Sequence, residues 1–346
     1  MTASREFVYV GSYTGESGGE GEGIALLSRD PATGDLSRLG LAARTPSPSF
    51  LARHPVVPML YAANELDVGT VSAFRVGPDG SLKLDAVVRT GGVHPCHVAV
   101  TPDGRHLLAA NYSSGSVSVH PVDAEGRPGE RTDLLDLFGE GPDPDRQKGP
   151  HAHMVAPDDT GHVLIADLGS DRVWRARLDP LSGRLLDLAP AIVTRPGFGP
   201  RHLLRTPDGA VLVAGELSAE LSWHRPGAGG LERAGATPAT TIPGEAFPSE
   251  VTGGPDGRFV YLANRGPDTV AIFAWDGERA TRVGEVPTGG VWPRHLTVAG
   301  DHLYVANERS HAVTIFRIDP QSGLPHPQGA PVAESSPTCL LRWLPA

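Results

Sequence analysis

Short apolar stretches, each opened by a proline, recur along the whole chain at intervals of 44 to 55 residues. The prolines are Pro48, Pro95, Pro150, Pro200, Pro248, Pro293 and Pro337. After each of the first six, a turn and a second apolar stretch follow, and long helical periodicity is absent. A repeat of about 40 to 50 residues built from short strands is typical of a β-propeller, whose blades bury their faces against one another. The pattern therefore predicts an all-β, seven-bladed propeller with four-stranded antiparallel blades.

The second apolar stretch of each repeat ends in a small residue followed by Asn, Asp or Glu. These stretches cover residues 60–64, 107–111, 163–167, 211–216, 260–264 and 303–307. Pro-Asp-Gly turns precede several of them, at 102–104, 207–209 and 255–257. Because such residues preset the dihedral angles of tight turns, each pair of stretches is predicted to form a hairpin.

The two ends of the chain complement each other. Residues 7–12 correspond to a second strand with no first strand before it, while residues 337–341 resemble an extra first strand. We expect the N- and C-terminal strands to pair in one blade, which closes the ring and removes its free edge. An unbroken repeat also predicts a single domain over residues 1–346.

Charge and composition limit the classes of partner and the cellular compartment that we expect for this protein. The chain has 30 basic and 40 acidic residues, a net charge of -10, which disfavours nucleic acid and anionic membranes. No apolar run reaches the roughly 18 residues of a membrane span, and residues 1–14 lack a signal-peptide pattern. The two cysteines, Cys96 and Cys339, suit a reduced cytoplasmic setting. We expect a cytoplasmic protein that is a monomer.

Chemically useful side chains are predicted to gather at one end of the blades. In an antiparallel hairpin, the start of the first strand and the end of the second meet at the same end. The residues after the prolines are Ser49, Cys96, His151, Arg201, Ser249, Arg294 and Thr338. Those that close the second strands include Glu65, Tyr112, Glu216, Arg265 and Glu308. One face should therefore carry arginine, histidine and glutamate.

A carboxylate and three guanidinium groups are the strongest candidates in this set. Arg201 and Glu216 belong to one hairpin, and Arg265 and Arg294 come from the next two blades. Arginine suits phosphate or carboxylate recognition because its planar fork donates two parallel hydrogen bonds. The alternative is that these residues form structural ion pairs between blades.

The stretch 139–150 makes one repeat longer than the others and contains Arg146 and Gln147. A long polar loop on a rigid scaffold is a usual place for a substrate lid. This loop leads into His151 and His153, and a histidine here could act as general acid or base or could orient a water molecule.

A metal site is disfavoured. His97, His202 and His295 could extend the histidine pair, but all three stand two residues after a proline, and such repetition favours a structural role. The ligand spacings of structural zinc and the carboxylate clusters of calcium sites are missing, as are a nucleophile elbow and a glycine-rich phosphate loop. We expect neither a metal nor a cofactor.

Several motifs resemble those of a known family, the seven-bladed propeller lactonases of the bacterial 6-phosphogluconolactonase type, which are related to the propeller carboxymuconate cycloisomerase. The resemblance covers nearly the whole chain. The motifs are YVGSYT (9–14), RQKGPHAH (146–153), GPRH (199–202), GEL (215–217), SEV (249–251), ANRG (263–266) and PRH (293–295). One departure is Gly215, where relatives usually carry asparagine.

The resemblance implies a set of site residues and a reaction. The catalytic set of the cycloisomerase branch falls on His151, Arg201, Glu216 and Arg265. Substrate-binding roles are expected for Arg294, His153, Arg146, Gln147 and Glu250. The implied reaction is hydrolysis of a small anionic sugar lactone, 6-phospho-D-glucono-1,5-lactone, to 6-phosphogluconate in the pentose phosphate pathway, with water as the nucleophile.

Three alternatives remain at this point. The same side chains could move a carbon-bound proton in a cycloisomerisation, or could hydrolyse another lactone. A propeller could instead be a non-catalytic scaffold, for which an apolar or aromatic surface would be expected. With 6% aromatic residues and a face rich in arginine, histidine and glutamate, the sequence favours a small polar ligand.

Overall fold

The computed structural model describes residues 6–228 and 230–344. The chain divides into two compact units, the first comprising Met1–Tyr13, Gly19–Ala42 and His202–Ala346, the second Thr14–Gly18 and Ala43–Arg201. The single domain over residues 1–346 stays a prediction. Residues 1–5, on which part of the signal-peptide expectation rests, lie outside the described residues. The described part of the chain contains no helix that is long and apolar enough to cross a membrane.

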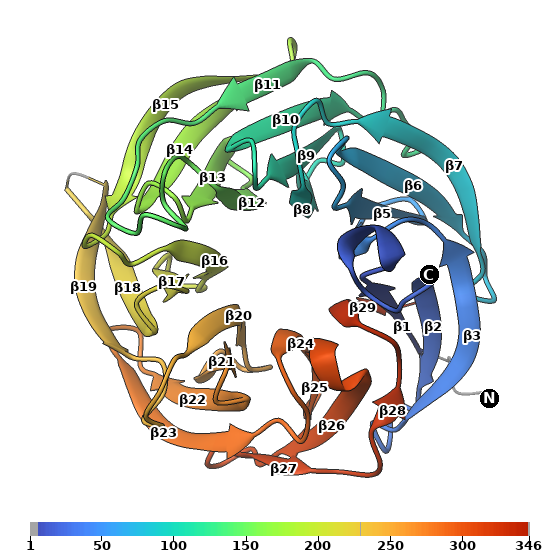
Figure 1. The fold of residues 1–346 in the computed structure, drawn as a ribbon, viewed down its shortest axis with the longest axis vertical. Coiled ribbons are helices and arrows are strands. Elements are labelled where there is room, and N and C mark those ends of the chain that lie inside the picture. The colour runs from blue at the N-terminus through green and yellow to red at the C-terminus, as the bar shows by residue number, and fades with distance from the viewer. Residues whose placement is uncertain (1–5, 229, 345–346) are drawn as a thin grey trace. The chain divides into compact units, whose positions relative to one another are not determined.

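The second unit contains three four-stranded antiparallel sheets, each formed by strands consecutive in the chain (Figure 1). The strands of the first sheet are β4 (Pro48–Arg53), β5 (Met59–Asn64), β6 (Thr70–Val76) and β7 (Leu82–Arg89). Those of the next are β8 (Pro95–Val100), β9 (His106–Asn111), β10 (Ser116–Pro121) and β11 (Asp133–Asp136). The third contains β12 (Ala152–Pro157), β13 (His162–Asp167), β14 (Arg172–Asp179) and β15 (Arg184–Val193). A 3₁₀ helix, η1 (Gly15–Ser17), also belongs to this unit.

Four further sheets belong mainly to the first unit. One consists of β16 (Pro200–Arg205), β17 (Val211–Gly215), β18 (Glu220–Gly227) and β19 (Gly230–Pro238), and the next of β20 (Phe247–Gly253), β21 (Phe259–Arg265), β22 (Thr269–Trp275) and β23 (Ala280–Pro287). Another contains β24 (Pro293–Ala299), β25 (His302–Asn307), β26 (Ala312–Ile318), β27 (Pro325–Pro327) and β28 (Val332–Ala333). The last contains β29 (Pro337–Trp343), β1 (Glu6–Ser12), β2 (Gly23–Arg29) and β3 (Leu36–Arg44), and the 3₁₀ helix η2 (Glu308–Ser310) follows β25. The described residues thus form the seven predicted blades.

The predicted closure by the two chain ends is confirmed. In the last sheet β29 pairs antiparallel with β1, so that Val10 lies opposite Leu340 and Gly11 opposite Cys339. Figure 1 shows β29 beside β1. The hydroxyl of Thr338 also donates to the carbonyl of Gly11 at 2.9 Å. The first strand of this blade therefore comes from the C-terminal end of the chain and the other three from the N-terminal end.

One blade departs from four continuous strands. Its outer edge is divided between β27 and β28, which both pair with β26. Pro325, Pro327 and Pro331 lie in or between these short strands. Proline lacks the backbone N–H that a continuous ladder requires, so this edge breaks into two pieces.

Adjacent blades within each unit share hydrophobic cores. Trp174 packs in a cluster with Leu108 and Val117 of the preceding blade, and Phe316 packs in a cluster with Tyr261. The hydroxyls of Tyr61, Tyr261 and Tyr304 stand at one repeat position, and each donates to a glycine carbonyl of the next blade at 2.6 to 3.0 Å. Burial raises the pKa of all three hydroxyls. These contacts are the inter-blade packing that the repeat requires.

Candidate functional site

His151 follows the loop 139–150 and lies directly before β12 in the second unit. Its backbone N–H donates to the Asp167 carboxylate at 2.8 Å, and its Nδ1 lies 2.9 Å from the carbonyl oxygen of Tyr112. A carbonyl can only accept, so Nδ1 carries the proton and, in the neutral ring, the lone pair is on Nε2. The contact therefore selects the tautomer in which Nε2 can act as a base.

Two glycines allow neighbouring backbone segments to pack directly against the segment that carries His151. A Cβ at Gly169 would lie 1.9 Å from the Gly149 carbonyl oxygen and 2.9 Å from the His151 ring. A Cβ at Gly115, whose φ is +60°, would lie 2.4 Å from the carbonyl oxygen of Pro150. Any side chain at either position would displace the backbone that carries His151.

Tyr112 connects three of the predicted site residues. Its ring stacks on His151 with centroids 4.5 Å apart and meets His153 edge-on at 5.7 Å. The Nη2 atom of Arg146 lies 3.2 Å from the tyrosine hydroxyl. The structure therefore brings His151, His153 and Arg146 together around one aromatic ring.

Gln147 and Arg201 are the other predicted residues of the second unit. Gln147 is fully buried, and its amide nitrogen donates to the Leu168 carbonyl and to the Asp171 carboxylate, both at 2.8 Å. It anchors the loop 139–150 to the neighbouring turn. Arg201 is the second residue of β16 and is 2% exposed. Its side chain is therefore held within the protein at the opening of a strand.

Glu216 and Arg265 form a buried ion pair in the first unit. Glu216 directly follows β17, and Arg265 is the last residue of β21. The Nη2 atom of Arg265 lies 2.7 Å from the Glu216 carboxylate, and the two side chains are 8% and 5% exposed. The Nε atom of Arg265 donates to the Phe247 carbonyl at 3.1 Å. Strand ends of two adjacent blades thus bring together two of the residues predicted for catalysis.

Trp292 adds an aromatic face beside this pair. Its ring centroid lies 5.4 Å from the Arg265 guanidinium carbon and 3.5 Å from that of Arg309, distances typical of cation–π contacts. Trp292 has a left-handed backbone with a φ of +64°, unusual for a bulky residue. This conformation occurs directly before Pro293, the first residue of β24.

Arg294, the second residue of β24, contacts one residue of its own blade and one of the adjacent blade. Its Nη2 donates to the hydroxyl of Tyr13, its guanidinium lies over the Tyr13 ring at 4.7 Å, and its Nη1 is 3.4 Å from the Glu308 carboxylate. Tyr13 follows β1 and Glu308 follows β25. The predicted rule that strand ends meet strand openings therefore holds for this arginine.

Glu250 lies between two histidines. Its carboxylate is 2.9 Å from Nδ1 of His202 and 3.3 Å from Nε2 of His295. Nδ1 of His295 accepts the N–H of Leu340, and Nδ1 of His97 accepts that of Val155. Each of the three repeated histidines thus contacts the next blade. Among the described residues, no group of three or more His, Cys, Asp or Glu is arranged to hold a metal ion.

The aromatic partners were not among the predicted site residues. Tyr112 and Tyr13 both directly follow second strands. The positional rule that identified Glu216 and Arg265 already placed Tyr112 at this face without giving it a role, and it could also have found Tyr13. Trp292 could have been found from the repeated Pro-Arg-His sequence, because it occupies the place of Gly199 in the other copy.

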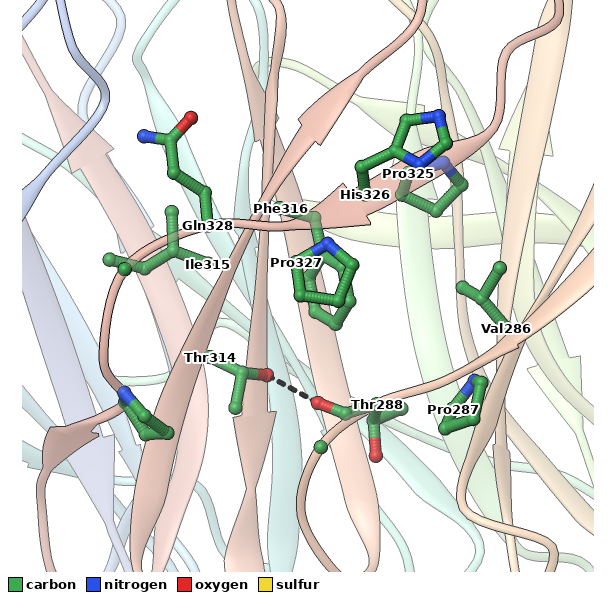
Figure 2. Close-up of a pocket in the computed structure, with 13 residues that line it drawn as sticks. Val286, Pro287, Thr288, Thr314, Ile315, Phe316, Pro325, His326, Pro327 and Gln328 are labelled. Atoms are coloured by element: carbon green, nitrogen blue, oxygen red, sulfur yellow. Dashed lines mark hydrogen bonds between the residues drawn. The ribbon is translucent and has the colours of Figure 1, made fainter.

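An apolar pocket in the first unit lies apart from all predicted site residues. Its cavity volume is about 410 Å³, and its lining comes from the end of β23, from β26 and from the proline-rich segment 325–331 (Figure 2). Polar groups at its wall bond to one another: the Thr314 hydroxyl donates to the Thr288 carbonyl at 2.7 Å (Figure 2). The lining includes none of the arginine or glutamate side chains described above.

Comparison with known proteins places the chain in a family. Residues 7–342 match the family model described as "Lactonase, 7-bladed beta-propeller". The chain is 32% identical over 331 residues to a 6-phosphogluconolactonase of Bacillus subtilis, covering 91% of this chain and 92% of that protein. It is 29% identical to a 6-phosphogluconolactonase of Formosa agariphila, covering 91% and 93%. The solved structure of a periplasmic gluconolactonase from Pseudomonas aeruginosa is 30% identical, with a TM-score of 0.91 and coverage of 99% and 100%. The resemblance seen in the motifs is confirmed, and the chain belongs to the family of seven-bladed β-propeller lactonases.

Proposed function

We propose that this protein hydrolyses 6-phospho-D-glucono-1,5-lactone to 6-phosphogluconate. The observation that carries the proposal is the Nδ1 contact of His151 with the Tyr112 carbonyl, which keeps Nε2 as a proton acceptor. The substrate is suggested by the two relatives named 6-phosphogluconolactonase. Lactone hydrolysis needs only a base for water and positive charge for the developing oxyanion, and the chain supplies both residue types.

His151 is the proposed general base. Its Nε2 takes a proton from water while the water oxygen bonds to the lactone carbonyl carbon. When the bond between that carbon and the ring oxygen breaks, the proton passes from His151 to the leaving ring oxygen. Glu216 is a carboxylate that could also accept a proton, but Arg265 engages it at 2.7 Å. We therefore assign Glu216 the role of holding Arg265.

The arginines are the proposed binders of negative charge. We assign Arg201 to the oxyanion of the tetrahedral intermediate, and Arg265 and Arg294 to the phosphate and hydroxyl groups of the substrate. Guanidinium groups held by aromatic rings, as Arg265 is by Trp292 and Arg294 by Tyr13, keep a defined plane for such contacts. Positive charge fixed before the reaction stabilises developing negative charge without reorganisation.

The remaining predicted residues have supporting roles in this proposal. Arg146 and His153, which contact Tyr112, are proposed to border the substrate. Gln147 fixes the loop that carries Arg146. Glu250 bonds to His202 and His295, so we propose that it acts on the substrate only through the packing of these blades.

We further propose that the protein works as a cytoplasmic monomer in the pentose phosphate pathway, without cofactor, metal or nucleic acid. The net charge of -10 disfavours polyanionic partners. Both cysteines are free and buried, which suits a reducing compartment. One relative is a periplasmic gluconolactonase, so cell fractionation is the direct test of the compartment.

The test is lactone hydrolysis at mildly acidic pH, where the spontaneous reaction is slow, with 6-phosphogluconolactone and unphosphorylated gluconolactone side by side. We expect a preference for the phosphorylated lactone of about 10²-fold in kcat/KM, equivalent to about 2.7 kcal/mol. Equal rates would instead indicate a broader gluconolactonase, as the Pseudomonas aeruginosa relative suggests. No rate above background on either lactone would overturn the proposal in favour of a cycloisomerase or a scaffold.

A further inference from the structure

Two strand openings share a sequence, and the residue before the proline is left-handed in both, as it also is before Pro48, Pro95 and Pro337. Pro200-Arg201-His202 follows Gly199, and Pro293-Arg294-His295 follows Trp292. Gly199 and Trp292 both have a φ of +64°. A residue before proline avoids helical conformations because the proline ring crowds it, and left-handed backbone is unfavourable for tryptophan. At these two openings, an aspartate side chain accepts the N–H of the residue before the proline.

In the second unit, Asp171 accepts hydrogen bonds from the segment that leads to Arg201. Its carboxylate accepts the N–H of Gly197 at 2.7 Å and the N–H of Gly199 at 2.8 Å. Its own carbonyl accepts the N–H and the hydroxyl of Thr194, at 3.0 and 2.9 Å. Four hydrogen bonds from one residue therefore fix the six residues before Pro200.

In the first unit, Asp268 makes three of the four corresponding contacts. Its carboxylate accepts the N–H of Trp292 at 2.8 Å, and its carbonyl accepts the N–H and the hydroxyl of Thr288, at 2.9 and 3.0 Å. The two aspartates have left-handed backbones as well, with φ values of +56° and +57°. A similar arrangement, with one carboxylate contact instead of two, thus precedes Arg294.

The carboxylate is specific to these two turns. The equivalent position before the strand that opens with Pro248-Ser249 is Ala219, whose carbonyl accepts the N–H of Ala239 in the same way but whose methyl group accepts nothing. Glycine occupies the place at Gly69 and Gly115, and at His311 the ring Nδ1 accepts the N–H of Ser336, the residue before Pro337, at 3.0 Å. Aspartate therefore stands where the next strand opens with Pro-Arg.

Gln147 extends the first of these arrangements. Its amide nitrogen donates to the same Asp171 oxygen that accepts from Gly199, at 2.8 Å, and the side chain is fully buried. The loop 139–150 is thereby connected through Asp171 to the strand that carries Arg201.

We propose that Asp171 and Asp268 are positioning residues that set the orientation of Arg201 and Arg294 by fixing the left-handed residue before each proline. Neither aspartate touches the substrate in this proposal. The kinetic consequences of this inference rest on the proposed lactonase function. The hydrogen bonds from the two aspartates to the backbone do not depend on the reaction. If Arg201 binds the oxyanion and Arg294 binds the phosphate, loss of Asp171 should lower kcat, whereas loss of Asp268 should mainly raise KM.

The first experiment compares Asp171→Ala and Asp268→Ala with the full-length wild type. We expect Asp171→Ala to lower kcat about 10²-fold, because a small displacement of a catalytic group has this cost. Asp268→Ala is expected to raise KM for the phosphorylated lactone more than it lowers kcat. Asp171→Asn retains one acceptor oxygen and should recover part of the lost rate. Wild-type kinetics in both alanine variants would overturn the inference.

A double-mutant cycle separates positioning from general destabilisation. If Asp171 acts through Arg201, Asp171→Ala has no further effect on kcat in an Arg201→Ala background. Losses that multiply in the double variant would mean that Asp171 does not act through this arginine. The matched control is Asp179→Ala, which removes a turn aspartate at the other end of β14 that also accepts a backbone N–H. This control should keep the wild-type kcat and KM.

Backbone hydrogen exchange tests, independently of activity, whether Asp171 restrains the segment before Arg201. Exchange in the segment 194–201 should accelerate in Asp171→Ala and remain unchanged in Asp179→Ala. Unchanged exchange in Asp171→Ala would overturn the inference even if the lactonase function is correct. Accelerated exchange in a protein whose wild type has no lactonase rate would instead retain the structural hold and reject the proposed function.

Discussion

Two buried carboxylate–arginine clusters in the first unit use the same chemistry at opposite ends of equivalent strands. Glu6 opens β1, and its carboxylate accepts from Arg29 at 2.8 Å and from Arg342 at 2.9 Å. Arg265 closes β21 and pairs with Glu216 at 2.7 Å. The two pairs are similarly buried, so burial does not distinguish them.

Their other neighbours do distinguish them. Arg29 also donates to the Tyr304 hydroxyl at 2.7 Å and to the Ala299 carbonyl at 2.9 Å, so all three of its nitrogens bond to protein acceptors in two blades. Both guanidinium groups lie near an aromatic ring, Arg29 at 5.8 Å from that of Tyr304 and Arg265 at 5.4 Å from that of Trp292, but Arg265 lies at the strand end where the site residues were predicted. Arg265 donates to the Phe247 carbonyl and the Glu216 carboxylate, so fewer of its N–H groups are engaged by protein than those of Arg29, and its planar fork can still meet a ligand. We therefore propose that the Glu6 cluster stabilises the fold and that the Glu216 pair serves the site.

Removing Glu6 should have the largest effect. Glu6→Ala leaves two arginines without their shared carboxylate in the blade that joins the chain ends, and breaking a buried pair costs about 3 to 5 kcal/mol. The free energy of unfolding from denaturant titration should fall by this amount, while kcat/KM of the folded enzyme is retained. A large loss of activity with unchanged stability would reverse our assignment of the two clusters.

Replacing Arg265 by lysine should have the next largest effect, on catalysis. Arg265→Lys keeps a positive charge opposite Glu216 but loses the planar fork and its contact with Trp292. We expect kcat/KM to fall about 10²-fold, or about 2.7 kcal/mol, with little change in Tm. The matched control is Arg29→Lys, which should lower Tm and leave kcat/KM unchanged. If Arg265→Lys behaves like Arg29→Lys, the Glu216 pair is structural.

Much of the fold could be predicted because its signals are local. The prolines that open first strands and the Pro-Asp-Gly turns predicted the hairpins, and the unmatched strands at the two ends predicted the pairing of β29 with β1. The broken edge at β27 and β28 was not predicted. Fourth strands vary most between repeats, so three prolines in one of them did not stand out against a constant pattern.

The site was predictable only in part. The hairpin rule predicts which residues gather at one end of the strands, and the contacts of Arg265 with Glu216 and of Arg294 with Glu308 agree with it. The sequence does not reveal the function of Asp171, because a turn aspartate there resembles the one at Asp103, which bonds only within its own turn. Which N–H a carboxylate accepts depends on a segment more than twenty residues away.

Acid should separate the Glu6 cluster from the rest of the fold, with the smallest effect of the three predictions. Burial, assisted by Arg233, lowers the pKa of His224 from 6.5 to about 4. His224 is thus neutral in the folded state but protonates in the unfolded state as the pH falls below 6.5, so the folded state loses stability on acidification. Between about pH 7 and pH 5 this loss is about 2 kcal/mol. Denaturant titrations at several pH values measure it.

The Glu6 cluster should not contribute to that loss. Burial raises the pKa of the Glu6 carboxyl, but hydrogen bonds and charge attraction from Arg342 and Arg29 outweigh it and lower the pKa below the ordinary 4.5. Its stabilisation is therefore complete above pH 4.5 and is lost only as the pH falls through the lowered value. The difference in the free energy of unfolding between wild type and Glu6→Ala should stay constant from pH 7 to pH 5.

His224→Gln keeps a hydrogen-bonding group beside Ser222 without a titrating ring, so it should flatten the wild-type pH dependence over the same range. An unchanged slope in His224→Gln would mean that other buried histidines, His106 and His120, whose pKa values burial also lowers, carry the acid sensitivity.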